Sequence, residues 1–331
     1  MKSIFLLPEF SFKLVFNQDI TQQIQSITEN DGQLHTRESI LNNPAAYQDV
    51  EIAFSSWGCP ELDSELLDAL PSLKALFYAA GSTRSFITDA FWERDILLTS
   101  AYQMNAIPVA EFTQAAITLS LKRFWHYMTA LHNREHGDKH ESIPGIYHGT
   151  RVGIISLGAI GQLVCQKLSH LDLDVLAYDP FASDDIFEAC GAVKSESLEE
   201  LFQSCDVVSL HTPWLPSTEN MITGDHLRSM RHGTTFINTS RGMVVDEPAM
   251  IEVLRERPDL TALLDVIRDE ANRDSSPLNQ LPNAILTPHI AGSKGRECFR
   301  MGAESLNECK RFLDGHPPIT PVTKEKMALI A

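Results

Sequence analysis

The middle of the chain contains an apolar run that passes into a glycine-containing turn and then into a helical pattern. This segment spans residues 152–161, and Ser156 stands where the pattern G-x-G-x-x-G has its first glycine. Backbone N–H groups at the start of such a helix can bind a pyrophosphate, and small residues let it approach closely. The turn therefore predicts a dinucleotide site, with an adjusted loop at Ser156. The expected contacts are Gly158, Ala159, Ile160 and Gly161.

Asp179 ends the next predicted strand, residues 175–178. A carboxylate at this point can accept hydrogen bonds from both ribose hydroxyls, and it would repel a 2′-phosphate. The three residues that follow, Pro180, Phe181 and Ala182, include no Arg or Lys that could offset this repulsion. The sequence therefore favours NAD over NADP. The alternative for Asp179 is a solvated turn residue before proline.

Short apolar runs alternate with helical patterns on both sides of the glycine turn. Before it, strands are predicted at 4–7, 50–54, 73–78 and 96–99, with helices at 20–27, 62–70 and 87–94. From the turn onward, strands are predicted at 152–156, 175–178, 207–210, 234–238, 262–265 and 284–286. This alternation is typical of doubly wound α/β domains with parallel sheets. We therefore predict an α/β fold made of two such domains.

The pattern also predicts how the two domains are connected. A helix is expected over 108–131 with Pro108 in its first turn, followed by a polar connector at 132–150. A last helical pattern at 297–312 is too short for a third domain, so we expect it to return to the first. The substrate-binding domain would then comprise residues 1–107 and 291–331. The NAD-binding domain, residues 108–290, would be inserted within it.

The bulk composition narrows the partners and the compartment. A net charge of −17 makes a nucleic acid or an anionic membrane an unsuitable partner. No apolar stretch approaches the roughly 18 residues that a membrane-spanning helix needs. The 6 cysteines form no C-x-x-C pair and no metal-ligand spacing, so we expect reduced thiols, no metal site and a cytoplasmic protein.

Polar residues stand at the ends of several later strands. They lie in the segments 211–213, 239–241, 265–270 and 287–289, which include Arg241, Asp265, Glu270 and His289. In an open α/β sheet, ligands collect at the carboxyl ends of the strands. We therefore expect a cation, an acid and an imidazole to meet at the cleft where a nicotinamide would lie.

The order of these motifs resembles the D-isomer-specific 2-hydroxyacid dehydrogenase family. The matching elements are the glycine turn, Asp179, segments 211–213 and 240–242, Asp265 with Glu270, and segment 287–289. Upstream, residues 105–111 (NAIPVAE) resemble the family motif N-A-x-x-V-A-E, and Ala80-Gly81 falls in its substrate-carboxylate loop. The resemblance spans residues 50–310. It implies a Rossmann NAD-binding domain inserted in a flavodoxin-like substrate domain.

The resemblance assigns Arg241, Glu270 and His289 as the catalytic residues of an NAD-dependent D-2-hydroxyacid dehydrogenase. When hydride adds to C2 of a 2-oxo acid, His289 would give a proton to the carbonyl oxygen, and in the reverse direction it would accept one. Glu270 would fix the imidazole and favour its charged form. Arg241 would hold the substrate carboxylate and carbonyl oxygen with its planar fork.

The same resemblance implies the remaining contacts. Substrate binding falls on Ala80, Gly81, Ser82 and Arg241. Cofactor binding extends to Thr212, Pro213, Thr218, Thr239, Ser240 and Asp265, the last of these at the nicotinamide amide. His211 is expected to position the cofactor loop, and a homodimer is expected to form through the cofactor domains, with the helical segment 112–128 suited to the interface.

Departures from the family pattern leave the substrate open. Arg84 either contacts a second anionic group of the substrate or faces solvent, and Trp214 stands where an aliphatic residue is common. Ala271 and Lys294 replace a proline and a threonine. Small acids of the glyoxylate or hydroxypyruvate type are candidates, and Glu270 disfavours a formate dehydrogenase. The alternative function is a non-enzymatic NAD-sensing scaffold of the same fold.

Overall fold

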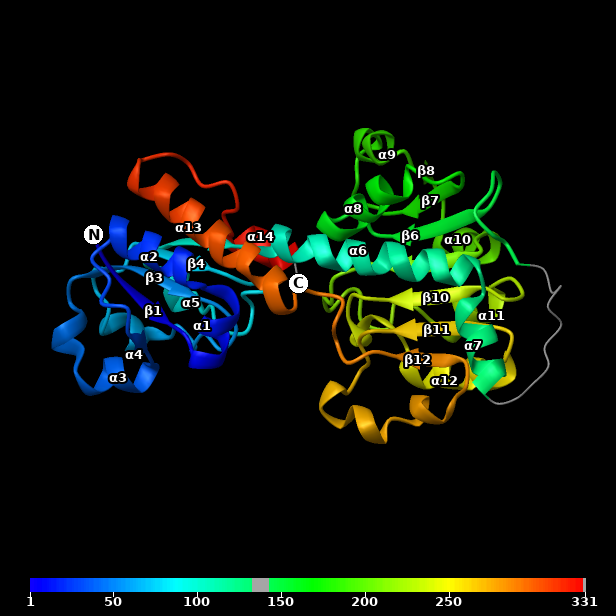
Figure 1. Ribbon diagram of the computed structural model, residues 1–331, viewed down its shortest axis with the longest axis horizontal. Helices are drawn as coiled ribbons and strands as arrows, with labels where there is room; N and C mark the ends of the chain where they lie inside the picture. Colours follow the sequence, from blue (N-terminus) through cyan, green and yellow to red (C-terminus); the bar gives the residue numbers. More distant parts are fainter. Residues whose placement is uncertain (133–142, 330–331) are drawn as a thin grey trace. The chain divides into compact units, whose positions relative to one another are not determined.

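The computed structural model describes residues 1–132 and 143–329, which divide into two compact units (Figure 1). Unit 1 comprises Met1–Asn105 and Ser293–Ala331, and unit 2 comprises Ala106–Gly292. The chain thus leaves unit 1 after residue 105 and returns after residue 292, where the sequence predicted boundaries at 107 and 290. Unit 1 is discontinuous in sequence, with unit 2 inserted in it.

Unit 1 contains a parallel sheet with the strand order β2-β1-β3-β4-β5. Its strands are β1 (Lys2–Leu6), β2 (Leu34–His35), β3 (Val50–Ser55), β4 (Ala75–Tyr78) and β5 (Leu97–Ser100). This is the doubly wound order of flavodoxin-like domains. The sequence did not predict β2, because two residues at a sheet edge are too few to form a visible apolar run.

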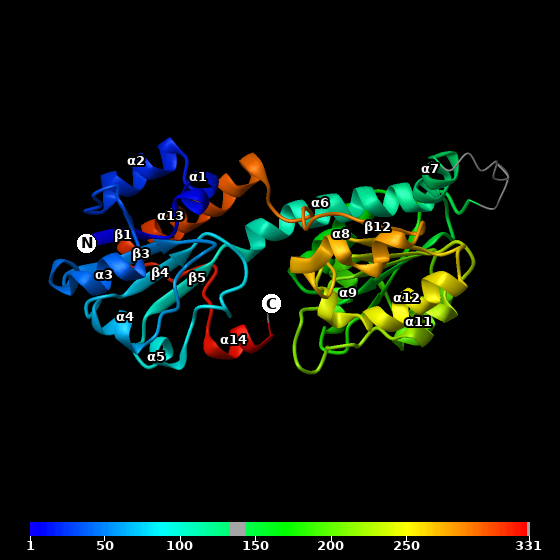
Figure 2. The same ribbon diagram turned by 90° about the horizontal axis from the view of Figure 1, so that it is seen from below.

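Helices cover both faces of this sheet because neighbouring residues of each strand point to opposite sides. Phe5 and Phe54 pack with α1 (Glu9–Val15), α2 (Gln18–Ile27) and α13 (Phe299–Leu313). Leu6 and Ala53 pack on the other side, where α3 (Arg37–Asn42), α4 (Ser64–Asp68) and α5 (Asp89–Trp92) lie. Helix α13 comes from the returning C-terminal segment, and both views show it beside α1 and α2 (Figures 1 and 2).

Unit 2 contains a parallel sheet with the order β12-β11-β10-β9-β6-β7-β8. Its strands are β6 (Arg151–Ile155), β7 (Asp174–Tyr178), β8 (Val193–Lys194), β9 (Val207–Leu210), β10 (Thr235–Asn238), β11 (Thr261–Leu264) and β12 (Ala284–Leu286). The order is that of a Rossmann sheet with one additional strand. The two-residue edge strand β8 was not predicted. The fold class is confirmed: two doubly wound parallel-sheet domains, one inserted in the other.

Both faces of the second sheet are also covered. Ile154 and Ile237 pack toward α6 (Tyr102–Leu121), α8 (Ala159–Leu168) and α9 (Asp184–Cys190). Ile155 and Phe236 pack toward α10 (Leu198–Ser204), α11 (Gly224–Ser229) and α12 (Glu247–Glu256). The chain leaves β6 toward β7 on one side and returns to β9 on the other. The carboxyl ends of β6 and β9 therefore flank the switch point, where ligands bind in such folds.

One predicted helix is wrong in its start and in its continuity. Helix α6 begins at Tyr102, so Pro108 lies inside it and not in its first turn. The carbonyl of Ala101 accepts the N–H groups of Met104 and Asn105, which starts the helix ahead of the proline. The helix also ends at Leu121, and α7 (Phe124–His132) follows after Arg123 adopts a φ of 52°. Pro108 therefore lies buried within the helix, where proline is usually unfavourable.

The rest of the chain consists of short turns and connections. Of the predicted connector 132–150, residues 133–142 lie outside the described residues. Short 3₁₀ turns occur at Pro44–Tyr47, Gly242–Val244, Glu270–Ser275, Pro277–Gln280 and Gly295–Cys298, and the short helix α14 spans Lys324–Leu329. No helix among the described residues has the length and apolar character needed to cross a membrane.

Candidate active site

Ser156 shapes the glycine turn in a way that the sequence did not reveal. Its φ is 74°, a left-handed conformation that is unfavourable for a residue with a side chain. Its hydroxyl lies 2.9 Å from the hydroxyl of Thr212, so the two side chains form a hydrogen bond. Because Ser156 follows β6 and Thr212 follows β9, this bond joins the two strand ends at the switch point.

The two glycines of the turn have different roles. A Cβ atom at Gly161 would lie 2.0 Å from the carbonyl oxygen of Ser156, so only glycine lets α8 pack against the turn. A Cβ atom at Gly158 would meet nothing within 4 Å. Gly158 is exposed and precedes α8 without a side-chain cap, which leaves N–H groups of the first turn free for an anion. The open side of Gly158 therefore fits a pyrophosphate.

Asp179 is tied to the same turn. One carboxylate oxygen accepts the N–H of Leu157 at 2.8 Å, and the other accepts those of Phe181 and Ala182 at 2.8 and 3.1 Å. The side chain is half-buried, and its bonds to Phe181 and Ala182 are those of a turn residue before proline, the alternative that the sequence left open. Asp179 couples the end of β7 to the glycine turn, and its ribose contact stays a prediction.

The segment after β9 is held by its own side chains. The Thr218 hydroxyl donates to the carbonyl of Pro213 at 2.6 Å and accepts the N–H of Leu215 at 2.8 Å. The Ser240 hydroxyl donates to the carbonyl of Thr212. These bonds fix the shape of the loop beside the switch point. Trp214, in the same loop, is 45% exposed.

His211 lies under this loop as a neutral group. Its Nε2 is 3.0 Å from the hydroxyl of Ser209, while Nδ1 is buried with no hydrogen-bond partner among the described residues. Burial lowers the pKa of His211 to about 3, because the charged ring would lose its hydration. This histidine therefore supports the loop and does not transfer protons near neutral pH.

Stability is expected to depend on pH through His211. The unfolded chain binds a proton below about pH 6.5, whereas the folded protein excludes it until about pH 3, so stability is lost as the pH falls through this window. When the pH is lowered from 7 to 5, the free energy of unfolding measured with urea should fall by about 2 kcal/mol more in the wild type than in His211→Gln. Equal losses in the two proteins would contradict the assignment.

Glu270 and His289 meet at the carboxyl edge of the second sheet. His289 Nδ1 is 2.8 Å from Glu270 Oε2, with the two side chains 48% and 38% exposed. Both line a surface hollow, together with Ala271, Arg273, Asp274 and Pro288. The pair is thus formed within unit 2 and open to a ligand.

Asp265 holds the loop that carries His289. It is only 1% exposed, and its carboxylate accepts the Thr287 hydroxyl at 2.6 Å and the N–H groups of Ile290 and Ala291 at 2.8 and 2.9 Å. Its carbonyl accepts the N–H of His289 at 3.0 Å. These bonds maintain His289 at a φ of 52°. The predicted contact of Asp265 with a nicotinamide amide stays a prediction.

Arg241 follows β10 and is close enough to Glu270 for electrostatic attraction. Burial lowers the pKa of Arg241, and the charge of Glu270 opposes this effect. Its Nη1 donates to the carbonyl of Ser240 at 2.7 Å, and the Asn238 side chain bonds both the Ser240 N–H and the Arg241 carbonyl, at 2.9 and 3.0 Å. The guanidinium is therefore a partly desolvated cation on an ordered turn, a suitable environment for an anionic ligand.

Three further predicted residues lie at the same edge of unit 2. Thr239 is buried, and its hydroxyl is 3.1 Å from that of Thr113 in α6. Ala159 and Ile160 form the half-buried start of α8, next to Gly158.

No group of three His, Cys, Asp or Glu side chains suited to a metal ion occurs in residues 1–132 and 143–329.

The predicted substrate loop lies in unit 1, after β4. The Ser100 hydroxyl is within hydrogen-bond distance of the carbonyls of Ala80 and Gly81, at 2.9 and 2.6 Å, and orders this loop. Ser82 is half-buried. Arg84 is exposed, which is compatible with both a contact to a second anionic group of the substrate and a side chain that faces solvent. The substrate contacts of this loop stay a prediction.

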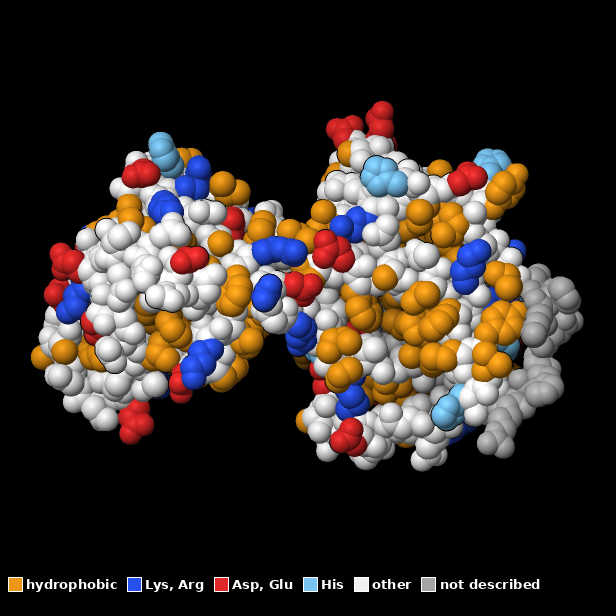
Figure 3. All heavy atoms as spheres, in the orientation of Figure 1, with side chains coloured by type: hydrophobic (Ala, Val, Ile, Leu, Met, Phe, Trp, Pro, Cys, Tyr) orange, Lys and Arg blue, Asp and Glu red, His pale blue; other side chains and the backbone are white. Residues whose placement is uncertain are grey.

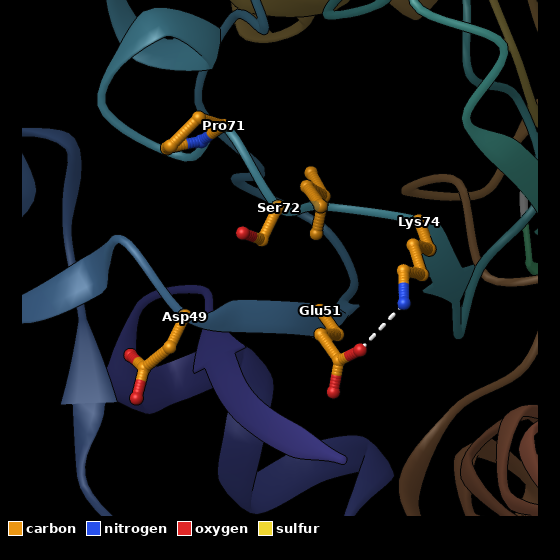
Figure 4. Close-up of a pocket in the computed structure, with 6 residues that line it drawn as sticks. Asp49, Glu51, Pro71, Ser72 and Lys74 are labelled. Atoms are coloured by element: carbon orange, nitrogen blue, oxygen red, sulfur yellow. Dashed lines mark hydrogen bonds and ion pairs between the residues drawn. The ribbon is translucent and has the colours of Figure 1, made fainter.

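A second hollow on unit 1 lies at the opposite ends of its strands. It is lined by Asp49, Glu51, Pro71, Ser72, Leu73 and Lys74 (Figure 4). Glu51 and Lys74 pair at 2.6 Å across it, and Asp49 pairs with Lys2 at 2.7 Å. Because each charged side chain of this hollow is paired with an opposite charge at the surface, it offers no catalytic arrangement.

Several known proteins are similar to this chain. Residues 115–291, more than half of the chain, match the family described as "D-isomer specific 2-hydroxyacid dehydrogenase, NAD binding domain". The chain is 32% identical over 252 residues to the (S)-sulfolactate dehydrogenase of Chromohalobacter salexigens, covering 76% of this chain and 81% of the relative. It is 30% identical over 270 residues to the glyoxylate reductase of Thermofilum pendens, covering 80% and 79%.

Solved structures of this fold are also similar. The apo D-mandelate dehydrogenase of Rhodotorula graminis matches with a TM-score of 0.80 and 23% identity, over 98% of both chains. The chain spans about half the length of several phosphoglycerate dehydrogenases that it matches.

The fold, the glycine turn and the His289–Glu270 pair define an α/β protein with a dinucleotide-binding domain. The chain belongs to the D-isomer specific 2-hydroxyacid dehydrogenase family, as the sequence motifs predicted. Residues 115–291 are its NAD-binding domain, which confirms NAD as the predicted cofactor.

Proposed function

We propose that the protein is an NAD-dependent oxidoreductase that interconverts small D-2-hydroxy acids and 2-oxo acids. The observation that carries the proposal is the 2.8 Å contact between His289 Nδ1 and Glu270 Oε2 at the ligand-binding edge of an NAD-binding sheet. A carboxylate can only accept a hydrogen bond, so Nδ1 carries a proton and Nε2 is the ring atom left to exchange one.

His289 and Glu270 together suit the proton transfer of this reaction. When bound, NADH would supply the hydride to C2 in the direction of reduction. Nε2 of the charged imidazole would give its proton to the carbonyl oxygen. In oxidation, Nε2 of the neutral ring takes the hydroxyl proton. Glu270 keeps the ring oriented and stabilises the positive charge in the protonated state.

Arg241 is proposed to bind the substrate carboxylate and the carbonyl oxygen. Its partial burial strengthens the attraction for an anion, and its planar fork suits a carboxylate. The backbone of Ala80, Gly81 and Ser82 is proposed to bind the carboxylate as well. The proposed cofactor contacts are Gly158, Ala159, Ile160, Gly161, Asp179, Thr212, Pro213, Thr218, Thr239, Ser240 and Asp265.

The proposed substrates are short acids, because the relatives named above are a sulfolactate dehydrogenase and a glyoxylate reductase. The test is NADH oxidation with a panel of 2-oxo acids that includes glyoxylate, hydroxypyruvate and sulfopyruvate, repeated with NADPH. Turnover with NADH and weaker turnover with NADPH are expected. Tight NADH binding without turnover of any acid would instead favour the non-enzymatic NAD-sensing scaffold.

We also propose a homodimer, formed through α6 and α7. Hydrophobic side chains gather on the face of unit 2 that carries these helices (Figure 3). Phe124, Met128 and Leu131 lie on one side of α7 and are 41%, 44% and 75% exposed. Sedimentation equilibrium should give twice the chain mass, and a monomer at all concentrations would refute this.

The cytoplasmic location of the protein stays a prediction.

A further inference from the structure

Arg273 contacts both segments that carry the candidate proton-transfer pair. It lies in the 3₁₀ turn Glu270–Ser275, and its side chain is only 15% exposed. Nη1 donates to the carbonyl of Thr287, and Nη2 donates to the carbonyl of Asp265 at 3.2 Å. Nη2 also lies 3.7 Å from Glu270 Oε2. One guanidinium therefore bridges the segment that leads to Glu270 and the segment that leads to His289.

The atoms that Arg273 contacts are shared with the pair itself. The carbonyl of Asp265 accepts from Arg273 and also from the N–H of His289, at 3.0 Å. Glu270 Oε2 is close to Arg273 and accepts from the imidazole at 2.8 Å. Because the Glu270 side chain is 38% exposed, water competes for it, and few contacts restrict its rotamer. The Arg273 guanidinium therefore restricts the Glu270 carboxylate and also the backbone at Asp265 and Thr287.

We propose that Arg273 is a positioning residue, which holds the Glu270 carboxylate against His289 Nδ1. The effect on turnover rests on the function proposed above, whereas the effect on the histidine ring does not. The planar fork is essential, because one point charge cannot bond two carbonyls in different directions. An exposed ion pair alone would contribute little, so the two carbonyl contacts carry most of the restraint.

Arg268 provides a matched control on the same segment. Its guanidinium bonds Asn220 at 2.7 Å and Glu219 at 2.9 Å, on the surface. Replacing it removes the same charge a few residues away, and the hydrogen bonds of its guanidinium involve neither Glu270 nor His289. Arg268→Met should therefore leave the pair intact, while Arg273→Met should loosen it.

The experiment combines NMR of ¹⁵N-labelled histidine rings with steady-state kinetics. In the wild type and in Arg268→Met, a protected Nδ1 proton of His289 is expected, and Glu270→Gln assigns it. In Arg273→Met this signal should broaden or vanish, and kcat should fall about a hundredfold with little change in NADH affinity. Arg273→Lys, which keeps the charge but lacks the planar fork, should show most of the same loss of signal and of kcat. In a protein that already carries Glu270→Gln, Arg273→Met should lower kcat much less than it does in the wild type.

Three results would overturn the proposal. The first is an unchanged Nδ1 signal and kcat in Arg273→Met, and the second is full recovery of both by lysine. The third is a fall in kcat on Arg273→Met that is equal in the wild type and in Glu270→Gln, which would indicate that Arg273 has a structural role only. If the wild type turned over no acid, the proposed function would fail, and the ring signal would still decide the role of Arg273.

Discussion

Replacing His289 by alanine is expected to lower the kcat for 2-oxo acid reduction by about a thousandfold, the range of a lost general acid. The reason is that Nδ1 is bonded to Glu270, which leaves Nε2 as the ring atom proposed to exchange a proton with the substrate. The side chain contributes no hydrogen bond to the glycine turn. NADH affinity, measured by fluorescence titration, should therefore change by no more than about twofold, or about 0.4 kcal/mol.

The matched control is His211→Gln, which removes a histidine from the same unit. Because His211 is buried and its pKa is lowered to about 3, it cannot act as the acid. Its replacement should reduce kcat far less than the loss of His289. A larger fall in kcat for His211→Gln, or equal losses of turnover and NADH binding in His289→Ala, would refute the assignment of His289.

The two glycines of the turn should respond in opposite ways to alanine. Gly161→Ala places a methyl group 2.0 Å from the Ser156 carbonyl oxygen, so the turn must move away from α8. A loss of about 3 kcal/mol in the free energy of unfolding is expected, as for other overpacked sites. Gly158→Ala meets no neighbour and has an extended backbone that any residue adopts. Its stability should stay within about 0.5 kcal/mol of the wild type.

NADH binding separates these two variants further. In Gly158→Ala the methyl group occupies the open side of the turn where the pyrophosphate is proposed to lie, so NADH affinity should fall about tenfold or more. Urea unfolding and fluorescence titration measure the two effects independently. Unchanged NADH affinity in Gly158→Ala would show that the cofactor does not bind at this turn. Unchanged stability in Gly161→Ala would contradict the close packing of α8.

The sequence predicted most of the fold because buried parallel strands leave continuous apolar runs. Every strand of four or more residues was expected near its observed position. The edge strands β2 and β8 are two residues long and half or fully exposed, so they leave no such signal. The start of α6 was wrong because the proline rule describes a local preference, while the helix begins ahead of the buried Pro108, with the Ala101 carbonyl accepting the N–H groups of Met104 and Asn105.

The candidate site was predictable where function depends on residue type and order. Glu270 and His289, 19 positions apart, were paired from motif order, and the structure places them in hydrogen-bond contact. The bond between Ser156 and Thr212 and the bridging contacts of Arg273 were not predicted. They depend on which backbone carbonyl or hydroxyl faces a side chain after folding, and no spacing rule records this.

The most direct test follows deuterium from NADH labelled at the transferring C4 position into the product of a small 2-oxo acid. The proposed reaction predicts one deuterium at C2 of the product, D configuration at that carbon when it is chiral, and about a thousandfold slower product formation with His289→Ala. Reduction that gave the L acid, or a product without deuterium at C2, would contradict the account.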